Sequence, residues 1–303
     1  MKTLLDNILA QCRPYAQLGN VASYIPELAK ADKNGFGICI VTEENGAVFT
    51  GDYDRQFTLQ SVIKPVILLL ALMDNGPEAV RDLVGVEATG KPFDTFNYSD
   101  RALSAEHINP MVNTGAIALC TLIKGADYEE KFQRLLDMTR RISGNPNLMV
   151  DERVYLSEKA TGNKNRALAY MLKAYGLITD DAEAVLDCYF RACSISVSTL
   201  DLARIASVFA NGGKVGEERL FPKAYAKYVN AVLMTCGMYD GSGEFALTVG
   251  VPAKSGVGGG IMAIVPGRMG IGIYSPSLDH KGNSIAGIKA LEELSKALDL
   301  SVF

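Results

Sequence analysis

Two side chains suited to acyl-transfer chemistry lie three residues apart in the segment QSVIKP, residues 60–65. On a helix, residues at this spacing share a face, so the Ser61 hydroxyl and the Lys64 amine should lie within reach of each other. Pro65 has no backbone N–H and fits only the first turn of a helix, so the helix should begin close to Ser61. The dipole and unpaired N–H groups at a helix start favour negative charge there. We therefore predict a Ser61 nucleophile activated by Lys64 as base.

A second motif, Lys254-Ser255-Gly256 followed by Val257, supports this prediction. A Ser-x-x-Lys pair alone occurs by chance in a chain of this length. Together with a later Lys-Thr-Gly-type triplet, however, it is the signature of class A β-lactamases and penicillin-binding proteins. The backbone N–H groups of Ser61 and Val257 would then form an oxyanion hole for the reacting carbonyl.

The elements that must position these motifs form three blocks. Residues 35–52 predict an antiparallel hairpin that turns at Glu44-Asn45-Gly46. Residues 78–214 have successive helical patterns, including 129–142 and 182–193. From Phe245 the sequence returns to short β-rich runs separated by Gly and Pro, and it ends in an amphipathic helix capped by Ser284.

Strands at both ends of the chain indicate one shared antiparallel sheet with an inserted helical part. We therefore predict an α+β fold in one domain, 1–303, made of a sheet-plus-helix lobe (1–77 and 215–303) and an all-helical lobe (78–214). A cleft between the lobes is the expected place for a ligand.

Composition excludes several classes of function. The 303 residues are 48% hydrophobic and carry a net charge of −4, with 30 basic and 34 acidic side chains, so no broad basic surface for nucleic acid is expected. No apolar run approaches the roughly 20 residues of a membrane span, which argues against a membrane partner. Asp6 and Arg13 interrupt the N-terminal segment, so it predicts an amphipathic helix, not a signal peptide, and a cytoplasmic location.

The cysteines and histidines predict no metal site and no cofactor. The chain has two histidines, His107 and His280, and neither has a role in the predicted chemistry; both are expected at structural or surface positions. The six cysteines have no CxxC spacing, so buried free thiols are predicted. They are Cys12, Cys39, Cys120, Cys188, Cys193 and Cys236.

Several longer motifs, in order, make the sequence resemble the serine-dependent glutaminase family over nearly the whole chain. They are Tyr24–Ala29, Gln60–Pro65, Asn109–Ile117, Ser157-Glu158 with Asn165, Tyr189-Phe190 with Cys193–Ile195, Cys236–Asp240 and Pro252–Val257. This resemblance implies a β-lactamase/DD-peptidase-like fold and the hydrolysis of L-glutamine to L-glutamate and ammonia. It also implies a homodimer or homotetramer, although no feature of this sequence requires one.

The resemblance also implies roles for side chains that would hold free glutamine. Glu158 would bind the α-ammonium, Asn113, Asn165 and Tyr189 would hold the charged end of the substrate, and Gln60 would line the pocket. One anion for an ammonium and neutral donors for a carboxylate match the chemistry of that substrate.

Two tyrosines, Tyr24 and Tyr239, match the active-site tyrosines of the family. Tyr239 is the better candidate to pass a proton to the departing ammonia, and it also belongs to the expected substrate-binding set.

Two other functions remain open from the sequence. A penicillin-interacting peptidase or β-lactamase-like enzyme would share the fold, but the Glu158, Asn113 and Asn165 set suits a free amino acid better than a peptide. A non-catalytic glutamine sensor would keep the pocket without the chemistry, and the presence of Ser61, Lys64 and Tyr239 argues against it.

Overall fold

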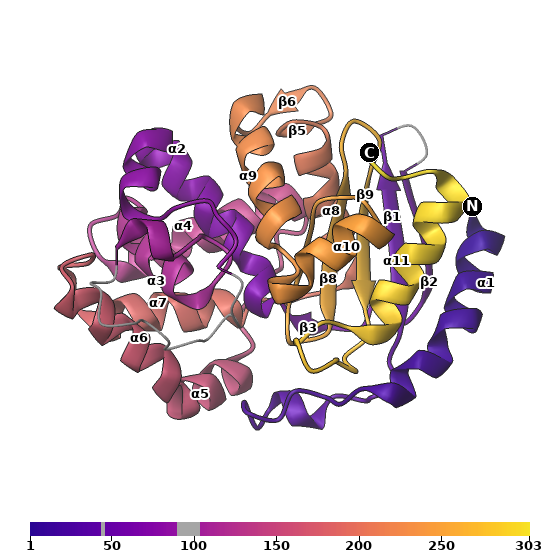
Figure 1. Cartoon of the computed structure of the whole chain (residues 1–303), viewed down its shortest axis with the longest axis horizontal. Coiled ribbons are helices and arrows are strands. Elements are labelled where there is room, and N and C mark those ends of the chain that lie inside the picture. The colour runs from indigo at the N-terminus through magenta and orange to yellow at the C-terminus, as the bar shows by residue number, and fades with distance from the viewer. Residues whose placement is uncertain (44–45, 90–103) are drawn as a thin grey trace.

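The computed structural model describes residues 1–43, 46–89 and 104–303, and it confirms an α+β architecture around an antiparallel sheet (Figure 1). The strand order is β2-β1-β9-β8-β7, so strands from both ends of the sequence share one sheet. Ile38 of β1 pairs with Ile273 of β9. The predicted turn residues Glu44 and Asn45 lie outside the described residues. The strands are β1 (Gly37–Thr42), β2 (Gly46–Gly51), β7 (Ala253–Ser255), β8 (Gly260–Val265) and β9 (Met269–Tyr274).

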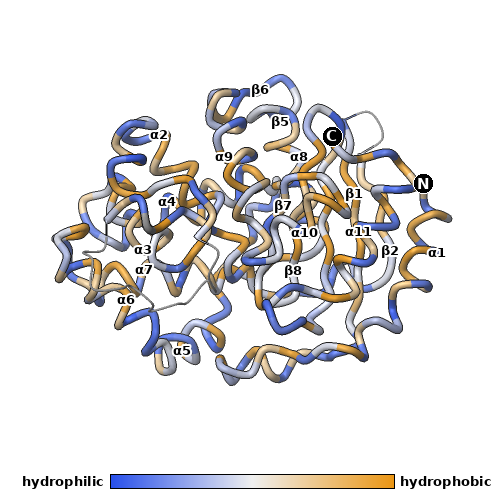
Figure 2. The backbone as a smooth tube through the Cα atoms, viewed as in Figure 1, coloured by the Kyte–Doolittle hydropathy of each residue, from blue (hydrophilic) through white to orange (hydrophobic). Residues whose placement is uncertain are grey.

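One face of the sheet is covered by the two ends of the chain. Helices α1 (Lys2–Cys12) and α11 (Ile285–Leu298) lie over it, and Ile38, Ile261 and Ile271 of the sheet join their apolar cluster. In Figure 2, hydrophobic colour runs along β1 and along parts of α1 and α11. Ser284 caps α11 by accepting a hydrogen bond from the Gly287 N–H at 3.1 Å, which confirms the predicted start of the helix.

The other face of the sheet is covered by α8 (Thr199–Ala210), which lies directly on β9. A methyl group at Gly272 would lie 2.2 Å from the Thr199 carbonyl oxygen, and one at Gly270 would lie 2.1 Å from the Ser207 nitrogen. Only glycine permits this close approach. Helix α8 falls within the predicted helical lobe, 78–214, but it packs on the sheet, so a lobe boundary before Thr199 fits this packing better. The division into lobes itself stays a prediction.

The helical lobe contains the elements that the periodicity predicted. The expected helices 129–142 and 182–193 are confirmed as α4 and α7, and the side chains of Asp127 and Asp181 cap them. The α-helices described between residues 64 and 193 are α2 (Lys64–Leu83), α3 (Asn113–Leu122), α4 (Tyr128–Ser143), α5 (Glu152–Thr161), α6 (Asn163–Ala174) and α7 (Ala182–Cys193).

The prediction of strands from Phe245 onward is wrong at its start. Residues Ser242–Thr248 form a short helix, α10, and the first strand after it begins at Ala253. Phe245 and Val249 lie four residues apart and are both buried in the cluster under α11, a spacing that suits a helix better than a strand.

Shorter elements connect these layers. Helix α9 (Lys223–Cys236) packs on α2, and the two-residue strands β3 and β4, and β5 and β6, form two small ladders. These strands are β3 (Phe57–Thr58), β4 (Ser196–Val197), β5 (Lys214–Val215) and β6 (Glu218–Arg219). The 3₁₀ turns are η1 (Arg13–Leu18), η2 (Leu28–Lys30), η3 (Gln60–Ile63), η4 (Ala105–His107) and η5 (Tyr239–Gly241).

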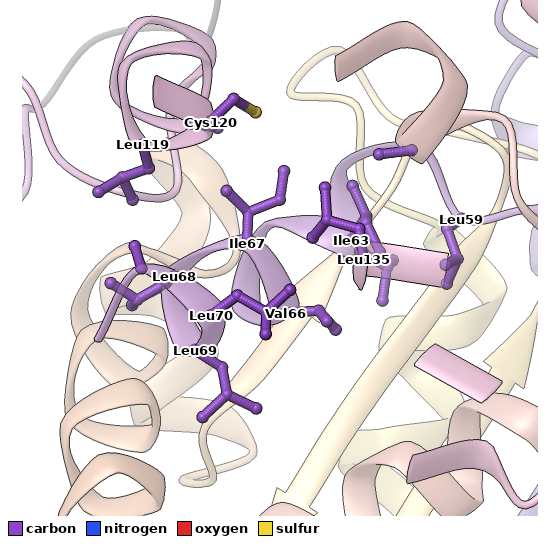
Figure 3. Close-up of a cluster of buried hydrophobic side chains, with 14 of the residues drawn as sticks. Leu59, Ile63, Val66, Ile67, Leu68, Leu69, Leu70, Leu119, Cys120 and Leu135 are labelled. Carbon is purple, nitrogen blue, oxygen red and sulfur yellow. The ribbon is translucent and has the colours of Figure 1, made fainter. Parts of the chain in front are cut away.

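One hydrophobic cluster joins the helical lobe to the sheet. Its centre is α2, whose residues from Lys64 to Leu72 are all buried, and Figure 3 shows Val66 to Leu70 gathered with Leu119 and Cys120 of α3 and Leu135 of α4. The same cluster includes Met262 and Ile264 of β8. Helix α2 is therefore a rigid support for the residues at its N-terminus.

All six cysteines are buried free thiols, as predicted. Within the three described ranges, no helix combines the length and the apolar composition that crossing a membrane requires.

Candidate active site

Ser61 and Lys64 lie where one short turn passes into α2, whose first helical segment runs from Lys64 to a break at Gly76. Ser61 belongs to η3, and α2 begins at Lys64 with Pro65 in its first turn, so the predicted helix start near Ser61 is confirmed. The side chain of Lys64 is fully buried; its Nζ donates to Asn113 Oδ1 at 2.7 Å and to the Met111 carbonyl at 3.3 Å. The amine is thus held by neutral oxygen atoms in a site without bulk water.

The Lys-Ser-Gly motif packs against the turn that carries Ser61. Lys254 and Ser255 end strand β7, and a methyl group at Gly256 would lie 2.6 Å from the Leu59 carbonyl oxygen and 3.4 Å from the Ser61 nitrogen. Glycine at this position lets the two backbones approach each other. The next residue, Val257, is buried, so the two motifs meet in the fold although about 190 residues separate them in the chain.

Tyr239 lies beside both motifs. Its hydroxyl donates to the Ser255 carbonyl at 3.1 Å, and it also forms a hydrogen bond with the Ser61 side chain. Burial raises the pKa of Tyr239 to about 12, against the opposing effect of the hydrogen bonds with Ser61 and Ser255. Tyr239 therefore keeps its proton at neutral pH.

Two residues of the site have an unusual backbone conformation. Gln60 has φ 48° and Tyr239 has φ 57°, in the left-handed region that non-glycine residues rarely adopt. Such strain concentrates where a fold must aim a side chain at a reacting group. Both residues directly flank or contact Ser61.

A cavity of about 410 Å³ opens beside Ser61, and most of the predicted substrate-binding residues line it. Gln60, Ser61, Asn113, Glu158, Asn165 and Tyr189 contribute to its wall. Tyr24 is 57% exposed at this wall, whereas Lys64, Tyr239 and Val257 are buried and do not line it. Tyr239 therefore contacts Ser61 from behind the cavity wall, and Tyr24 belongs to the wall itself.

Glu158, on α5, is the buried carboxyl group of this cavity. Its Oε2 atom has no hydrogen-bond partner among the described residues. Burial raises the pKa of Glu158 to about 8, while a hydrogen bond with Gln60 and the charge of Lys64 oppose this shift. A buried carboxyl oxygen without a partner is costly unless a ligand satisfies it.

Asn113 connects Lys64 to other residues of the cavity wall. It stands at the first position of α3, accepts from Lys64, and donates from Nδ2 to Asn165 Oδ1 at 2.8 Å. The Tyr189 hydroxyl lies 3.4 Å from the same Asn113 oxygen. The three predicted residues Asn113, Asn165 and Tyr189 therefore form one connected group.

The cavity also contains side chains that the sequence did not assign to it. His280, expected at a structural or surface position, lines the wall together with Lys281. Both follow the last strand in a loop that belongs to none of the quoted motifs, so no sequence pattern indicated them. The side chain of His107 lies outside the described residues. The other unassigned wall residues are Ile25, Thr161, Gly162, Asn163, Lys164, Cys193 and Asp240.

Comparison with known proteins identifies relatives along the whole chain. The sequence model of the glutaminase family matches residues 19–303. A glutaminase of Clostridium tetani is 51% identical, and the match covers 100% of both chains. A glutaminase of Clostridioides difficile is 50% identical, covering 100% of this chain and 98% of the other.

Solved structures of glutaminases have the same fold. A probable glutaminase from Bacillus subtilis complexed with 6-diazo-5-oxo-L-norleucine has a TM-score of 0.89 and 36% identity, covering 98% of this chain and 94% of that one. A covalent complex of the Bacillus subtilis glutaminase YbgJ with 5-oxo-L-norleucine has a TM-score of 0.90 and 35% identity, covering 99% of both chains. These matches confirm the predicted β-lactamase/DD-peptidase-like fold class.

Proposed function

The chain belongs to the glutaminase family, and on this premise we propose that it hydrolyses L-glutamine to L-glutamate and ammonia through a γ-glutamyl ester of Ser61. One observation carries this proposal. Ser61 lies at the cavity wall in hydrogen-bond contact with the buried Tyr239, and Glu158, whose Oε2 has no hydrogen-bond partner among the described residues, belongs to the same wall.

Recognition of the substrate follows from the charges of the cavity. The α-ammonium of glutamine would pair with Glu158 and satisfy its free oxygen, which lowers the pKa of the carboxyl group and favours its charged form. Asn113, Asn165 and Tyr189, which hydrogen bonds join into one neutral group at the cavity wall, would hold the α-carboxylate, and Gln60 orients Glu158 through their hydrogen bond. This arrangement aims the side-chain amide at Ser61.

In the acylation step, Lys64 takes the Ser61 proton while Ser61 Oγ attacks the γ-amide carbon. The backbone N–H groups of Ser61 and Val257 stabilise the oxyanion. As the C–N bond breaks, the nitrogen takes the bonding electron pair and the proton of Tyr239, so that ammonia leaves and a phenolate remains.

In the deacylation step, water attacks the ester carbonyl, and its hydroxyl group becomes part of glutamate. The released Ser61 oxygen regains a proton from Lys64, and the proton of the water returns to Tyr239. Every proton is therefore restored at the end of the cycle.

The covalent complex of the Bacillus subtilis relative supports a nucleophilic mechanism, because it formed by reaction of that protein with 6-diazo-5-oxo-L-norleucine. The same reagent tests the proposal here. Treatment of this protein, digestion and mass spectrometry should locate the label on Ser61, and prior L-glutamate should slow the labelling. A label on another residue would contradict the role of Ser61.

Two further predictions remain, namely a homodimer or homotetramer, from the family resemblance, and a cytoplasmic location, from the N-terminal segment. Sedimentation analysis of the purified protein and fractionation of the source cells measure them directly.

A further inference from the structure

Asn283 is a buried side chain that joins two parts of the active site and has no role in the proposed mechanism. It lies between β9 and α11, and only 1% of it is exposed. Its Oδ1 accepts from the Ser255 hydroxyl at 2.5 Å, and its Nδ2 donates to the Met238 carbonyl at 3.2 Å. One amide group therefore links strand β7, which carries the Lys-Ser-Gly motif, to the residue before Tyr239.

These hydrogen bonds complete a closed ring through Tyr239. The Tyr239 hydroxyl donates to the Ser255 carbonyl at 3.1 Å, so Ser255 holds the phenol with its carbonyl and Asn283 with its hydroxyl. The Met238 carbonyl accepts from Asn283 and also from the Gly241 N–H at 3.0 Å. The hydroxyl and the backbone of Tyr239 are thus both tied to one residue of β7, and linked hydrogen bonds of this kind strengthen one another.

The backbone of Tyr239 needs such support. Its φ of 57° lies in the left-handed region, and a non-glycine residue keeps that conformation only where its surroundings hold it there. Within the turn, the Ser242 hydroxyl donates to the Tyr239 carbonyl at 2.8 Å, and Asn283 holds the same turn from a distant part of the chain. We infer that Asn283 is a positioning residue that holds Tyr239 in place for proton transfer to the departing ammonia, an inference that rests on the proposed function.

The loop that carries Asn283 is itself fixed by hydrogen bonds. Asp279 Oδ1 accepts from the backbone N–H groups of Lys281 and Asn283, each at 2.9 Å, and the Asp279 N–H donates to the Asn283 carbonyl at 2.8 Å. The same loop contributes His280 and Lys281 to the cavity wall. Asn283 therefore contacts the turn of Tyr239 from a support that is held by its own hydrogen bonds, as a positioning residue requires.

The test separates leaving groups that need a proton from those that do not. Glutamine loses ammonia and needs the Tyr239 proton, whereas the γ-(4-nitrophenyl) ester of L-glutamate loses a phenolate that needs none. For both substrates kcat/KM reports the steps through acylation, which need Ser61 and Lys64. We expect Asn283→Ala to lower kcat/KM by roughly 10- to 100-fold for glutamine and by less than about threefold for the ester.

Asn145 offers a matched control. Its side chain also accepts one hydrogen bond, from the Asn147 N–H at 3.1 Å, and donates one, to Asp201 Oδ1 at 3.1 Å, outside the active-site cavity. Asn145→Ala should leave kcat/KM unchanged for both substrates, because its hydrogen bonds do not reach Tyr239.

A double variant shows whether Asn283 acts through Tyr239. Tyr239→Phe removes the proton that Asn283 is inferred to position, so it should reproduce the selective loss for glutamine. Asn283→Ala combined with Tyr239→Phe should lose little beyond Tyr239→Phe alone, since two residues that serve one proton transfer are not additive.

An equal loss on both substrates would show that Asn283 supports Ser61 or the oxyanion hole and would overturn the inference. A normal glutamine rate in Asn283→Ala, or a multiplied loss in the double variant, would overturn it as well. If Asn283→Ala does not fold, Asn283→Leu, which is similar in size but can neither donate nor accept, should show the same selective loss. Absence of ammonia release by the unmodified protein, or its persistence in Ser61→Ala, would instead refute the proposed function.

Discussion

At the scale of single residues, Glu158 is a buried carboxyl group in the wall of the cavity. In the empty cavity it is 5% exposed with one oxygen unpartnered among the described residues, and its pKa is about 8. A carboxyl group in this environment is unfavourable by itself, and in the role proposed for Glu158 the ammonium of the substrate would make it favourable.

The environment of Glu158 predicts how kcat/KM for glutamine depends on pH. Below about pH 8 the carboxyl group of the free enzyme is protonated and cannot pair with an ammonium, so kcat/KM for glutamine should rise as the pH rises through 8. Glu158→Gln should raise KM and remove this rise. A profile of kcat/KM against pH checks both, and a flat profile in the unmodified protein would contradict the role of Glu158.

The same group predicts a gain in stability on substitution. Its folded-state pKa of about 8 lies above the ordinary 4.5, so the unfolded chain ionises first and stability falls as the pH rises from 4.5 to 8. Glu158→Gln removes this ionisation and should stabilise the empty protein at pH 8 by about 1–3 kcal/mol. Urea unfolding measures the difference, which should shrink near pH 4.5.

The motifs placed Ser61, Lys64 and the Lys254–Gly256 triplet near one another, and the structure shows that Gly256 packs against the turn that carries Ser61. The roles of these residues stay predictions. His280 and Lys281 were missed because a loop brings them to the cavity, and loop positions have no periodicity to read. The hydrogen bonds of Asn283 were missed for the same reason, because Asn283 belongs to that loop.

At the scale of elements, the approach of α8 to β9 fixes the sheet behind the site. Gly272→Ala would place a methyl group 2.2 Å from the Thr199 carbonyl oxygen, so α8 must move away. We expect a loss of about 1–3 kcal/mol in the free energy of unfolding, measured in urea.

Gly243→Ala is the matched control for this substitution. It lies in α10, has no heavy atom within 4 Å of the added methyl group, and has no positive φ. It should be neutral or slightly stabilising. Equal changes in the free energy of unfolding for the two substitutions would contradict the close packing of α8 on β9.

Element predictions succeeded where caps and periodicity agree and failed where tertiary packing decides. Asp127, Asp181 and Ser284 mark helix starts that the patterns located within a residue or two. Helix α10 was assigned to the β-rich region because Phe245 to Val251 is apolar and short, and such runs do not distinguish a strand from a buried helix.

At the scale of the whole molecule, residues from both predicted lobes, the sheet-plus-helix lobe and the helical lobe, form the walls of the cavity. Ser61 precedes the helical lobe, Glu158 and Asn165 belong to α5 and α6, and His280 follows the last strand of the sheet. That the two ends share a sheet was predictable from strand patterns, but the residues that face each other across the cavity were predictable only through the family resemblance.

A ligand in this cavity should therefore stabilise both parts together. Bound glutamine at 100 times its Kd should add about 2.7 kcal/mol to the stability of Ser61→Ala, which binds without turnover. Hydrogen exchange should slow in α5 and α6 and also in β7. Protection confined to one part would contradict a site shared between them.

The depth of the same cavity predicts that the protein distinguishes L-glutamine from L-asparagine. L-asparagine is one methylene shorter than L-glutamine, so its amide carbon should stop short of Ser61 when Glu158 holds the ammonium. The difference should reach about 1–3 kcal/mol, or roughly 10- to 200-fold in kcat/KM. Equal rates for the two amides would argue against the fixed anchor at Glu158.

Ammonia release from L-glutamine by the purified protein and by Ser61→Ala tests the central claim most directly. We predict turnover by the unmodified protein, and loss of turnover with retained glutamine binding and an unchanged fold in Ser61→Ala. Near-normal ammonia release by the folded Ser61→Ala variant would contradict a serine nucleophile, and glutamine binding without ammonia release by the unmodified protein would contradict the enzyme itself.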